Sequence, residues 1–260
     1  MIFRCQQEAY SLLKRFAAQQ RRSVCIEGPQ GCGKTFLARE YSKLLGVTDF
    51  KTVSPVVDDI RECIEAVLSL RTPVVLQVEN LDNGGAAAAS ALLKILEEPR
   101  NNLYIVVTCE NLYRIPDTIV SRSTCVTVGG PTEVDIVDYS ELLDFQKYHQ
   151  LKDNSIWGAV RNFNQVKLVF DMNLAQLEYF AKLPDIFKFS DAVSNLMWKL
   201  QHYDDNTTTP IQLVLQYLVC VSPTVYIRKL ILEALDELDR HRLADHVVLA
   251  NLLMAAKYTE

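Results

Sequence analysis

The sequence predicts an α/β domain built on a parallel sheet, followed by an all-helical second half. From residue 6 to about residue 128, short β-rich runs alternate with helical stretches, the pattern of a parallel sheet with helices on both faces. After the run GGPT at 129–132 the β signals stop and apolar residues recur at helical spacing. With 49% hydrophobic and 23% charged residues, the 260-residue chain can bury a substantial core.

Five runs predict the strands of the sheet. Each is short, rich in β-branched or aromatic residues, and bounded by polar or turn-forming residues. They are SVCIE at 23–27, FKTV at 50–53, PVVLQVE at 73–79, LYIVVT at 103–108 and TCVTV at 124–128. The run TFLAREYSKLL at 35–45 predicts the helix that connects the first two strands.

Two apolar stripes predict helices in the second half, because their members recur at i, i+3 and i+4. The first is Ile211, Val214, Leu215 and Leu218, and the second is Ile227, Leu230, Ile231, Ala234, Leu235 and Leu238. A break at KLPD, residues 182–185, divides this half in two. We therefore predict a core domain at 1–129, a small helical domain at 130–182 and a terminal helical domain at 183–260.

Charge, cysteine usage and hydropathy narrow the class of protein. A net charge of −5 argues against non-specific nucleic-acid binding by the whole surface, so contact with DNA would require a local basic patch. The seven cysteines are scattered and form no C-x-x-C pair, which argues against a disulfide framework and against a zinc site. No apolar run approaches the roughly 18 residues of a membrane span. We expect a cytoplasmic protein with reduced thiols and no membrane contact.

The motif GPQGCGKT at 28–35 is the strongest functional signal. It lies between a predicted strand and a predicted helix and matches G-x-x-x-x-G-K-[ST]. In this pattern glycines allow main-chain N–H groups to surround phosphates, the lysine reaches the β and γ oxygens, and the threonine hydroxyl binds Mg²⁺. We therefore expect a nucleotide site formed by Gly28, Pro29, Gly31, Cys32, Gly33, Lys34, Thr35 and Phe36.

The strand VVLQV runs into ENLD at 79–82, where a nucleotide hydrolase needs acidic residues. Glu79 at the strand end predicts a ligand for the metal shell, together with Thr35. Asn80 then occupies the position of the base, and an amide cannot accept a proton from water. In a register shifted by one residue, Glu79 is itself the base and Val78 replaces the metal ligand. A third interpretation is that Glu79 only ends a strand.

The run NGGAAAASALLKILEEPRNNLYIVVT at 83–108, with IPDTIVSRST at 115–124, resembles the AAA+ subunits of replication clamp loaders, above all the bacterial δ′ and γ/τ subunits. Their pattern is an acid pair, a short loop, A-N-A-L-L-K-x-L-E-E-P, a sensor strand and S-R-C. Counting back from ALLK places Glu79 and Asn80 on the acid pair. That pair decays in δ′ subunits but persists in motor subunits, whereas many δ′ chains have lost the phosphate loop that this chain retains.

The resemblance implies roles for three further residues. Arg122 in SRST corresponds to an arginine finger that acts in trans on a neighbouring subunit's ATP, with Ser123 in place of the usual cysteine. Thr108 corresponds to the sensor of the γ-phosphate, and Arg161 in WGAVRNFNQVKLVFD, 157–171, corresponds to the sensor of the lid helix, although Phe163 departs from the pattern. The plainer alternatives are a solvent-exposed arginine at a helix end, a buried strand threonine and a solvated helix charge.

The resemblance also implies an architecture and partners. It makes the three domains an AAA+ core, a lid and a collar, with HRLADHVVLANLLMAA at 241–256 similar to the closing collar helix. ATP or ADP with Mg²⁺ would be the cofactor, and other subunits of a homo- or heteropentameric ring, a sliding clamp and primer-template DNA would be the partners. The stretch 36–73 holds only Cys63 where bacterial relatives carry a four-cysteine module. We therefore expect no zinc, as in loaders of viral or replication-factor-C type.

The expected function is an ATPase subunit that couples nucleotide binding, and slow hydrolysis dependent on partners and DNA, to clamp opening and loading. Two alternatives stay open at this point. One is a structural δ′-like subunit of the same complex that holds nucleotide without cleaving it. The other is an AAA+ protein unrelated to clamps that shares only the ATPase core.

Overall fold

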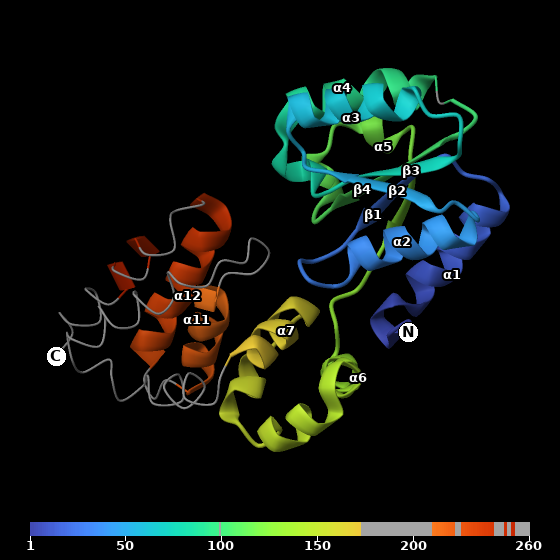
Figure 1. The fold of residues 1–260 in the computed structure, drawn as a ribbon. Coiled ribbons are helices and arrows are strands. Elements are labelled where there is room, and N and C mark those ends of the chain that lie inside the picture. The colour runs from blue at the N-terminus through green and yellow to red at the C-terminus, as the bar shows by residue number, and fades with distance from the viewer. Residues whose placement is uncertain (99, 173–209, 222–224, 242–246, 249–250, 253–260) are drawn as a thin grey trace. The chain divides into compact units, whose positions relative to one another are not determined.

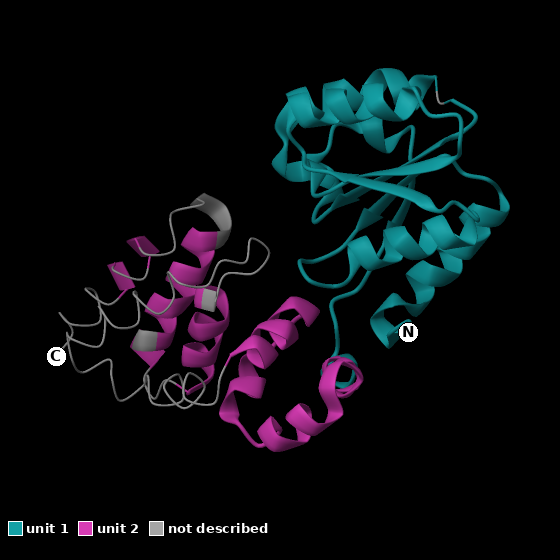
Figure 2. Cartoon of the chain, viewed as in Figure 1, with its two compact units in different colours: residues 1–135 teal, residues 136–260 magenta. Residues whose placement is uncertain are grey.

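The structure is a computed structural model that describes residues 1–98, 100–172, 210–221, 225–241, 247–248 and 251–252. It divides into two compact units, 1–135 and 136–260 (Figure 2). The first contains α1 Arg4–Ala18, β1 Ser23–Glu27, α2 Lys34–Leu44, β2 Asp49–Val53, α3 Val57–Leu68, β3 Val74–Val78, η1 Leu81–Asn83, α4 Gly85–Glu97, β4 Leu103–Cys109, η2 Leu112–Arg114, α5 Asp117–Val120 and β5 Thr124–Thr127. Then follow α6 Glu133–Leu151, η3 Ser155–Ala159, α7 Phe163–Asp171, α11 Pro210–Val221 and α12 Val225–His241.

The first unit is a five-stranded parallel sheet between two layers of helices, which confirms the predicted fold class. The strand order is β2-β3-β4-β1-β5, and all four strand pairs are parallel. Figure 1 shows α1 and α2 on one face of the sheet and α3, α4 and α5 on the other. In a sheet of this kind, ligands bind beyond the carboxyl ends of the strands. The phosphate-loop motif lies at that edge, between β1 and α2.

Alternation along β3 determines which of its side chains can reach the phosphate loop. The whole strand is buried. Val74, Leu76 and Val78 belong to the core under α3 and α4, whereas Val75 belongs to the core under α1 and α2. Because successive side chains of a strand point to opposite faces, Gln77 shares the α2 face with Val75.

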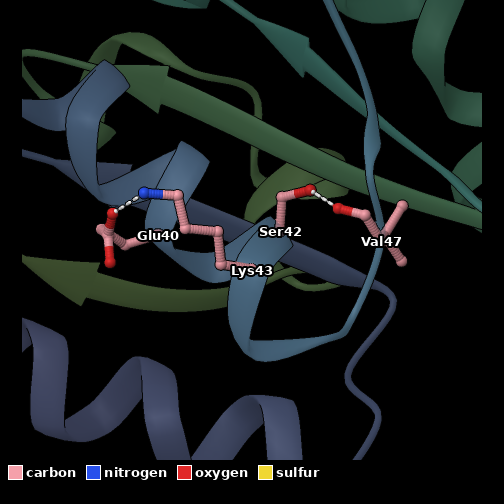
Figure 3. A network of polar contacts seen from close by, with 4 residues as sticks. All are labelled: Glu40, Ser42, Lys43 and Val47. Carbon is pink, nitrogen blue, oxygen red and sulfur yellow. Dashed lines mark hydrogen bonds and ion pairs between the residues drawn. The ribbon is translucent and has the colours of Figure 1, made fainter.

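The turn after α2 fixes where β2 begins. Gly46 has a φ of 71°, the left-handed conformation that ends many helices. Its N–H donates to the carbonyl of Lys43 and that of Val47 donates to the carbonyl of Ser42, each over 3.0 Å. Figure 3 shows the Ser42 hydroxyl donating to the Val47 carbonyl at 2.6 Å, and the Lys43 ammonium paired with Glu40. This C-cap holds the end of α2, the helix that starts at the phosphate loop.

The segment after β5 is tied to the start of α1 by a buried carboxylate. Asp135 Oδ1 accepts from the main-chain N–H of Arg4 at 2.7 Å, and Oδ2 accepts from the N–H and hydroxyl of Thr132. Burial opposes ionisation of Asp135, but the hydrogen bonds from Thr132 and from the N–H groups of Arg4 and Cys5 outweigh it and hold the pKa below its usual value of 3.8. One side chain thus joins the first turn of α6 to the first turn of α1.

The second unit is helical in its described part. Helix α6 has a kink at Asp144, whose φ of −158° and ψ of 97° are not helical. The stripe Ile211, Val214, Leu215 and Leu218 is buried on α11, as its spacing predicts. The predicted break at 182–185, and with it the lid–collar boundary, lies outside the described residues, as does most of 241–256. No helix of the described ranges combines the length and apolar composition that a membrane crossing requires.

Candidate functional site

The loop at 28–35 follows the carboxyl end of β1 and requires glycine at several positions. Gly31 and Gly33 have φ values of 68° and 91°, which side chains of L-residues rarely adopt. A Cβ on Gly28 would lie 2.8 Å from the carbonyl oxygen of Val128 and 2.9 Å from Cys32 Sγ. The glycines of the motif therefore serve the conformation and packing of the loop, and they leave its main-chain N–H groups unhindered by side chains.

The side chain of Gln6 on α1 is hydrogen-bonded to this loop, a contact that no sequence pattern indicated. Its side chain is buried, and Nε2 donates to the carbonyl of Cys32 at 2.8 Å while Oε1 accepts from the N–H of Phe3 at 3.3 Å. A Cβ on Gly33 would lie 2.3 Å from Gln6 Nε2. Gln6 thus caps its own helix and fixes the phosphate loop at once.

Lys34 places a buried positive charge inside the loop. The residue is 7% exposed, and its ammonium donates to the carbonyls of Gly28 at 2.7 Å and Pro29 at 3.0 Å. No carboxylate of the described residues lies within ion-pair distance of it. A buried charge that is compensated only by neutral dipoles is costly. The loop therefore suits an anionic ligand, which would supply the missing negative charge.

The other predicted loop residues contribute main chain rather than side chain. Cys32 is fully buried, and burial raises the pKa of its thiol above the usual value, so its sulfur is a core group. Phe36 is half-buried against the core under α1 and α2. Pro29 is exposed, with its ring near Gly130. Direct contact of these residues with a nucleotide stays a prediction.

The side chains of Thr35 and Glu79 are hydrogen-bonded to each other beside the loop. The Thr35 hydroxyl donates to Glu79 Oε1 at 3.0 Å, and both residues are half-buried. Gln77 Nε2 lies 3.3 Å from Thr35 Oγ1 and 3.5 Å from Glu79 Oε1. A hydroxyl and a carboxylate side by side beyond a phosphate loop are the oxygen ligands that Mg²⁺ prefers beside a nucleotide. This contact favours the register in which Glu79 serves the metal, since Val78 points into the opposite core.

Asn80 adopts a conformation that suits its residue type. Its φ of 44° and ψ of 54° are left-handed, where asparagine is among the few tolerated non-glycine residues. Its N–H donates to the Thr108 hydroxyl at 3.0 Å. Thr108 is 1% exposed, so this bond joins the ends of β3 and β4, and contact of Thr108 with a γ-phosphate stays a prediction.

Asp82 also joins the ends of β3 and β4, a role that the sequence did not indicate. Its Oδ2 accepts from the N–H groups of Glu110 at 3.1 Å and Asn111 at 3.3 Å. Asp82 thereby fixes the loop that follows β4. The described residues contain no group of three or more His, Cys, Asp or Glu side chains that could hold a metal ion.

Arg122 lies just after α5 and is partly exposed. Its Nη2 pairs with Glu97 Oε1 at 3.0 Å, and its Nη1 donates to the carbonyl of Thr118 at 3.0 Å. The Arg122 side chain is 37% exposed to solvent. The neighbouring Ser123 shares a 2.8 Å hydrogen bond with Ser23 of β1, which gives the serine a role in the sheet. Arg122 is thus a tethered cation open to solvent, and its action in trans stays a prediction.

Arg161 belongs to the second unit and lies outside the helix in which the sequence comparison placed it. Helix α7 begins at Phe163, because the Asn162 side chain caps it by accepting from the N–H of Gln165 at 3.0 Å. Arg161 precedes this cap, and its N–H donates to Gln165 Oε1 at 2.7 Å. Phe163 is buried and stacks against Tyr139, with ring centroids 4.8 Å apart, so the aromatic residue fills the core. The role of Arg161 as a sensor stays a prediction.

Comparison with known proteins adds a family relationship to this geometry. Residues 57–131 match the model of the family described as DNA polymerase III, delta subunit. Subunit delta′ of DNA polymerase III from Haemophilus influenzae is 28% identical over 131 residues, which cover 45% of this chain. The match spans only 39% of the length of that relative. The family model covers β3 with the following Glu79, β4 and Arg122, but not the loop at 28–35.

Solved structures show the same fold over nearly the whole chain. A DNA polymerase III gamma subunit-related protein from Thermotoga maritima superposes with a TM-score of 0.58 at 18% identity, covering 96% of this chain and 98% of that one. A mutant of RuvB from Thermotoga maritima superposes with a TM-score of 0.51 at 14% identity, covering 97% and 83%. At these identities the likeness concerns the AAA+ fold alone. Residues 57–131 thus resemble a DNA polymerase III delta-subunit family in sequence, and the chain shares an AAA+ fold with these solved structures.

Proposed function

We propose that the chain binds ATP or ADP with Mg²⁺ at the loop 28–35 and holds this nucleotide as a subunit of a sliding-clamp loader. The observation that carries the proposal is the contact between Thr35 and Glu79 beside the buried Lys34. The three side chains come from two separate parts of the sheet edge. Together they offer one cation to phosphates and two oxygens to a metal, the set of groups that a nucleotide–magnesium complex requires.

The residues fit the metal and the nucleotide with a division of roles. Lys34 would bind the β and γ phosphates, and the main-chain N–H groups of the loop would surround them. Thr35 would bind Mg²⁺ directly, and Glu79 would accept hydrogen bonds from its shell. When bound, Mg²⁺ would neutralise part of the phosphate charge. The chain's own residues thus bind and orient the nucleotide.

Hydrolysis at this site should be slow. Asn80 occupies the position of the base, and its amide can orient water but cannot accept a proton. Its N–H is committed to Thr108, and its left-handed backbone suits asparagine better than glutamate. These observations support a site that binds nucleotide and hydrolyses it slowly. The match at 57–131 favours a clamp-loader subunit over an AAA+ protein unrelated to clamps.

The proposed partners follow from the same relationship. As a relative of DNA polymerase III subunits, the chain would assemble with other subunits into a ring that opens a sliding clamp and places it on primer-template DNA. Arg122 would face the nucleotide of the neighbouring subunit. The chain would bind nucleotide at its own site and hydrolyse it slowly. It would also supply Arg122 to the neighbouring site of the ring.

Calorimetry with ATP and Mg²⁺ tests the nucleotide site. Lys34→Ala removes the only buried lysine of the described residues and should abolish detectable ATP binding. Lys43→Ala, on the same helix, removes an exposed lysine paired with Glu40 and is the matched control. The control should bind ATP like the parent. If Lys34→Ala folds and binds ATP as tightly as the control does, the loop is not a phosphate site and the proposal is wrong.

A further inference from the structure

Gln77 is a polar residue in the middle of a strand that is otherwise apolar. The side chain is fully buried, between Leu76 and Val78 of the buried strand β3. It lies two residues before Glu79, so both side chains point to the face of the sheet that α2 covers. A glutamine in such a position costs free energy unless its amide is hydrogen-bonded, and a packed apolar residue would avoid that cost. Its presence indicates a task for the amide.

The amide nitrogen of Gln77 approaches both members of the proposed metal-binding pair. Nε2 lies 3.3 Å from Thr35 Oγ1 and 3.5 Å from Glu79 Oε1. Rotating the amide by half a turn would place its oxygen beside the carboxylate oxygen, where the two would repel. The nitrogen therefore faces Thr35 and Glu79.

This arrangement determines how the Thr35 hydroxyl can be used. A hydroxyl has one proton to donate and two lone pairs that accept. The proton goes to Glu79 at 3.0 Å, and one lone pair accepts from Gln77. One lone pair remains for a metal ion. Gln77 thus fixes the rotation of the hydroxyl in the orientation that a cation requires.

The oxygen of the same amide has no partner. Gln77 Oε1 is buried, and no donor among the described residues reaches it. Buried side-chain oxygens normally accept at least one hydrogen bond from protein or ordered water. Because the nitrogen of this amide already faces Thr35 and Glu79, water that accompanies a metal there is a donor of the right chemistry. Mg²⁺ in nucleotide sites keeps several such waters.

We propose that Gln77 is a positioning residue of the magnesium site: its Nε2 orients Thr35 and Glu79, and its Oε1 accepts a hydrogen bond from water of the metal shell. This inference rests on the proposed nucleotide function and adds a residue to it. It assigns Gln77 to the outer shell, where partners orient the direct ligands and typically change metal affinity by about 10- to 100-fold.

The test measures ATP affinity of the full chain by calorimetry while Mg²⁺ is varied from zero, with EDTA, to saturation. Gln77→Met keeps the length of the side chain and removes both polar atoms. It should raise the Mg²⁺ concentration for half-maximal ATP affinity by about 10-fold or more. Affinity in EDTA should stay that of the parent, because the phosphate contacts of Lys34 are intact.

A further variant separates positioning from packing. Val75→Ala, on the same strand and face, removes buried volume without removing a polar atom, so it should lower the thermal midpoint and leave the Mg²⁺ requirement unchanged.

The outcomes distinguish this inference from the proposed function. A parent that binds no ATP at any Mg²⁺ concentration refutes the nucleotide site and the inference with it. A parent that binds ATP with Mg²⁺, beside a folded Gln77→Met that has the same Mg²⁺ requirement, overturns the inference alone. In that second case the Gln77 amide only fills the core, and Gln77→Met should differ from the parent in its thermal midpoint alone.

Discussion

The hydroxyl of Thr35, at the start of α2, donates a 3.0 Å hydrogen bond to the carboxylate of Glu79, which follows β3. The two residues are 44 positions apart in the chain, and only the parallel arrangement of β1, β4 and β3 brings them together. Their contact favours the register in which Glu79 serves the metal. Glu79 contacts Thr35 of the loop, Val78 faces the opposite core, and Asn80 has a left-handed backbone conformation.

Removing the charge of Glu79 should weaken the metal site. Glu79→Gln retains a partner for Thr35 but not the negative charge that attracts Mg²⁺, so ATP affinity should fall when Mg²⁺ is present and stay unchanged in EDTA. Titration calorimetry under both conditions checks this. Glu40→Gln removes a half-buried carboxylate of α2 that pairs with Lys43, and this variant should bind like the parent. Loss of hydrolysis in the assembled complex with Mg²⁺-dependent binding intact would instead make Glu79 the base.

Arg122 should act on a neighbouring subunit. In the complex assembled with partner subunits, Arg122→Ala should lower ATP turnover at the adjacent site by roughly 10³- to 10⁵-fold, the range known for arginine fingers. ATP binding at its own site should be unchanged. Arg114→Ala, an exposed arginine of η2, is the matched control. Loss of its own ATP binding in Arg122→Ala would assign the arginine a structural role.

The ion pair between Arg122 and Glu97 bears on this test. It is exposed, and such pairs contribute about 0–1 kcal/mol, so it holds the arginine in place without preventing its release. Arg122→Ala should therefore leave the thermal midpoint nearly unchanged, and lost turnover can be attributed to the guanidinium.

Asp135 should make stability depend on acid pH. Its pKa in the folded protein lies below 3.8, so the unfolded chain binds the proton more readily. The stabilisation is complete above about pH 5 and decreases as pH falls through 3.8 towards the folded pKa. Asp135→Asn replaces charge-assisted hydrogen bonds by neutral ones, so it should cost about 1 kcal/mol at pH 7 and less near pH 3. Urea unfolding at both values measures this, and an equal cost at pH 7 and pH 3 would contradict the assignment.

The sheet could be predicted from the sequence because buried parallel strands consist of short apolar runs. The runs at 23–27 and 124–128, for example, became β1 and β5 within one residue. The loop at 28–35 could be placed between β1 and α2 because its motif depends on local residue types, and its binding of phosphates stays a prediction. The start of α7 was not predicted, although Asn162 followed three residues later by Gln165 is a local sequence signal for the beginning of a helix.

The parts of the site that depend on tertiary contacts could not be predicted in the same way. Gln6 reaches Cys32 only because α1 packs beside α2, and nothing in its local sequence indicates this. Gln77 did carry a signal, a lone polar residue in VVLQV two positions before Glu79. Its meaning depended on the distance to Thr35, which the fold alone provides.

The central claim is that this site holds nucleotide more readily than it cleaves it. The direct measurement is to incubate the isolated chain with Mg²⁺ and labelled ATP, recover the protein–nucleotide complex, and follow how much of the bound label remains ATP. A positioned base is typically worth roughly 10²- to 10⁴-fold in rate, so with Asn80 in its place we expect one ATP per chain that stays uncleaved over many minutes. Asn80→Glu, assembled with partners, should raise turnover. A chain that binds no ATP, or that alone converts its bound ATP to ADP within seconds, would show that this site does not retain uncleaved ATP.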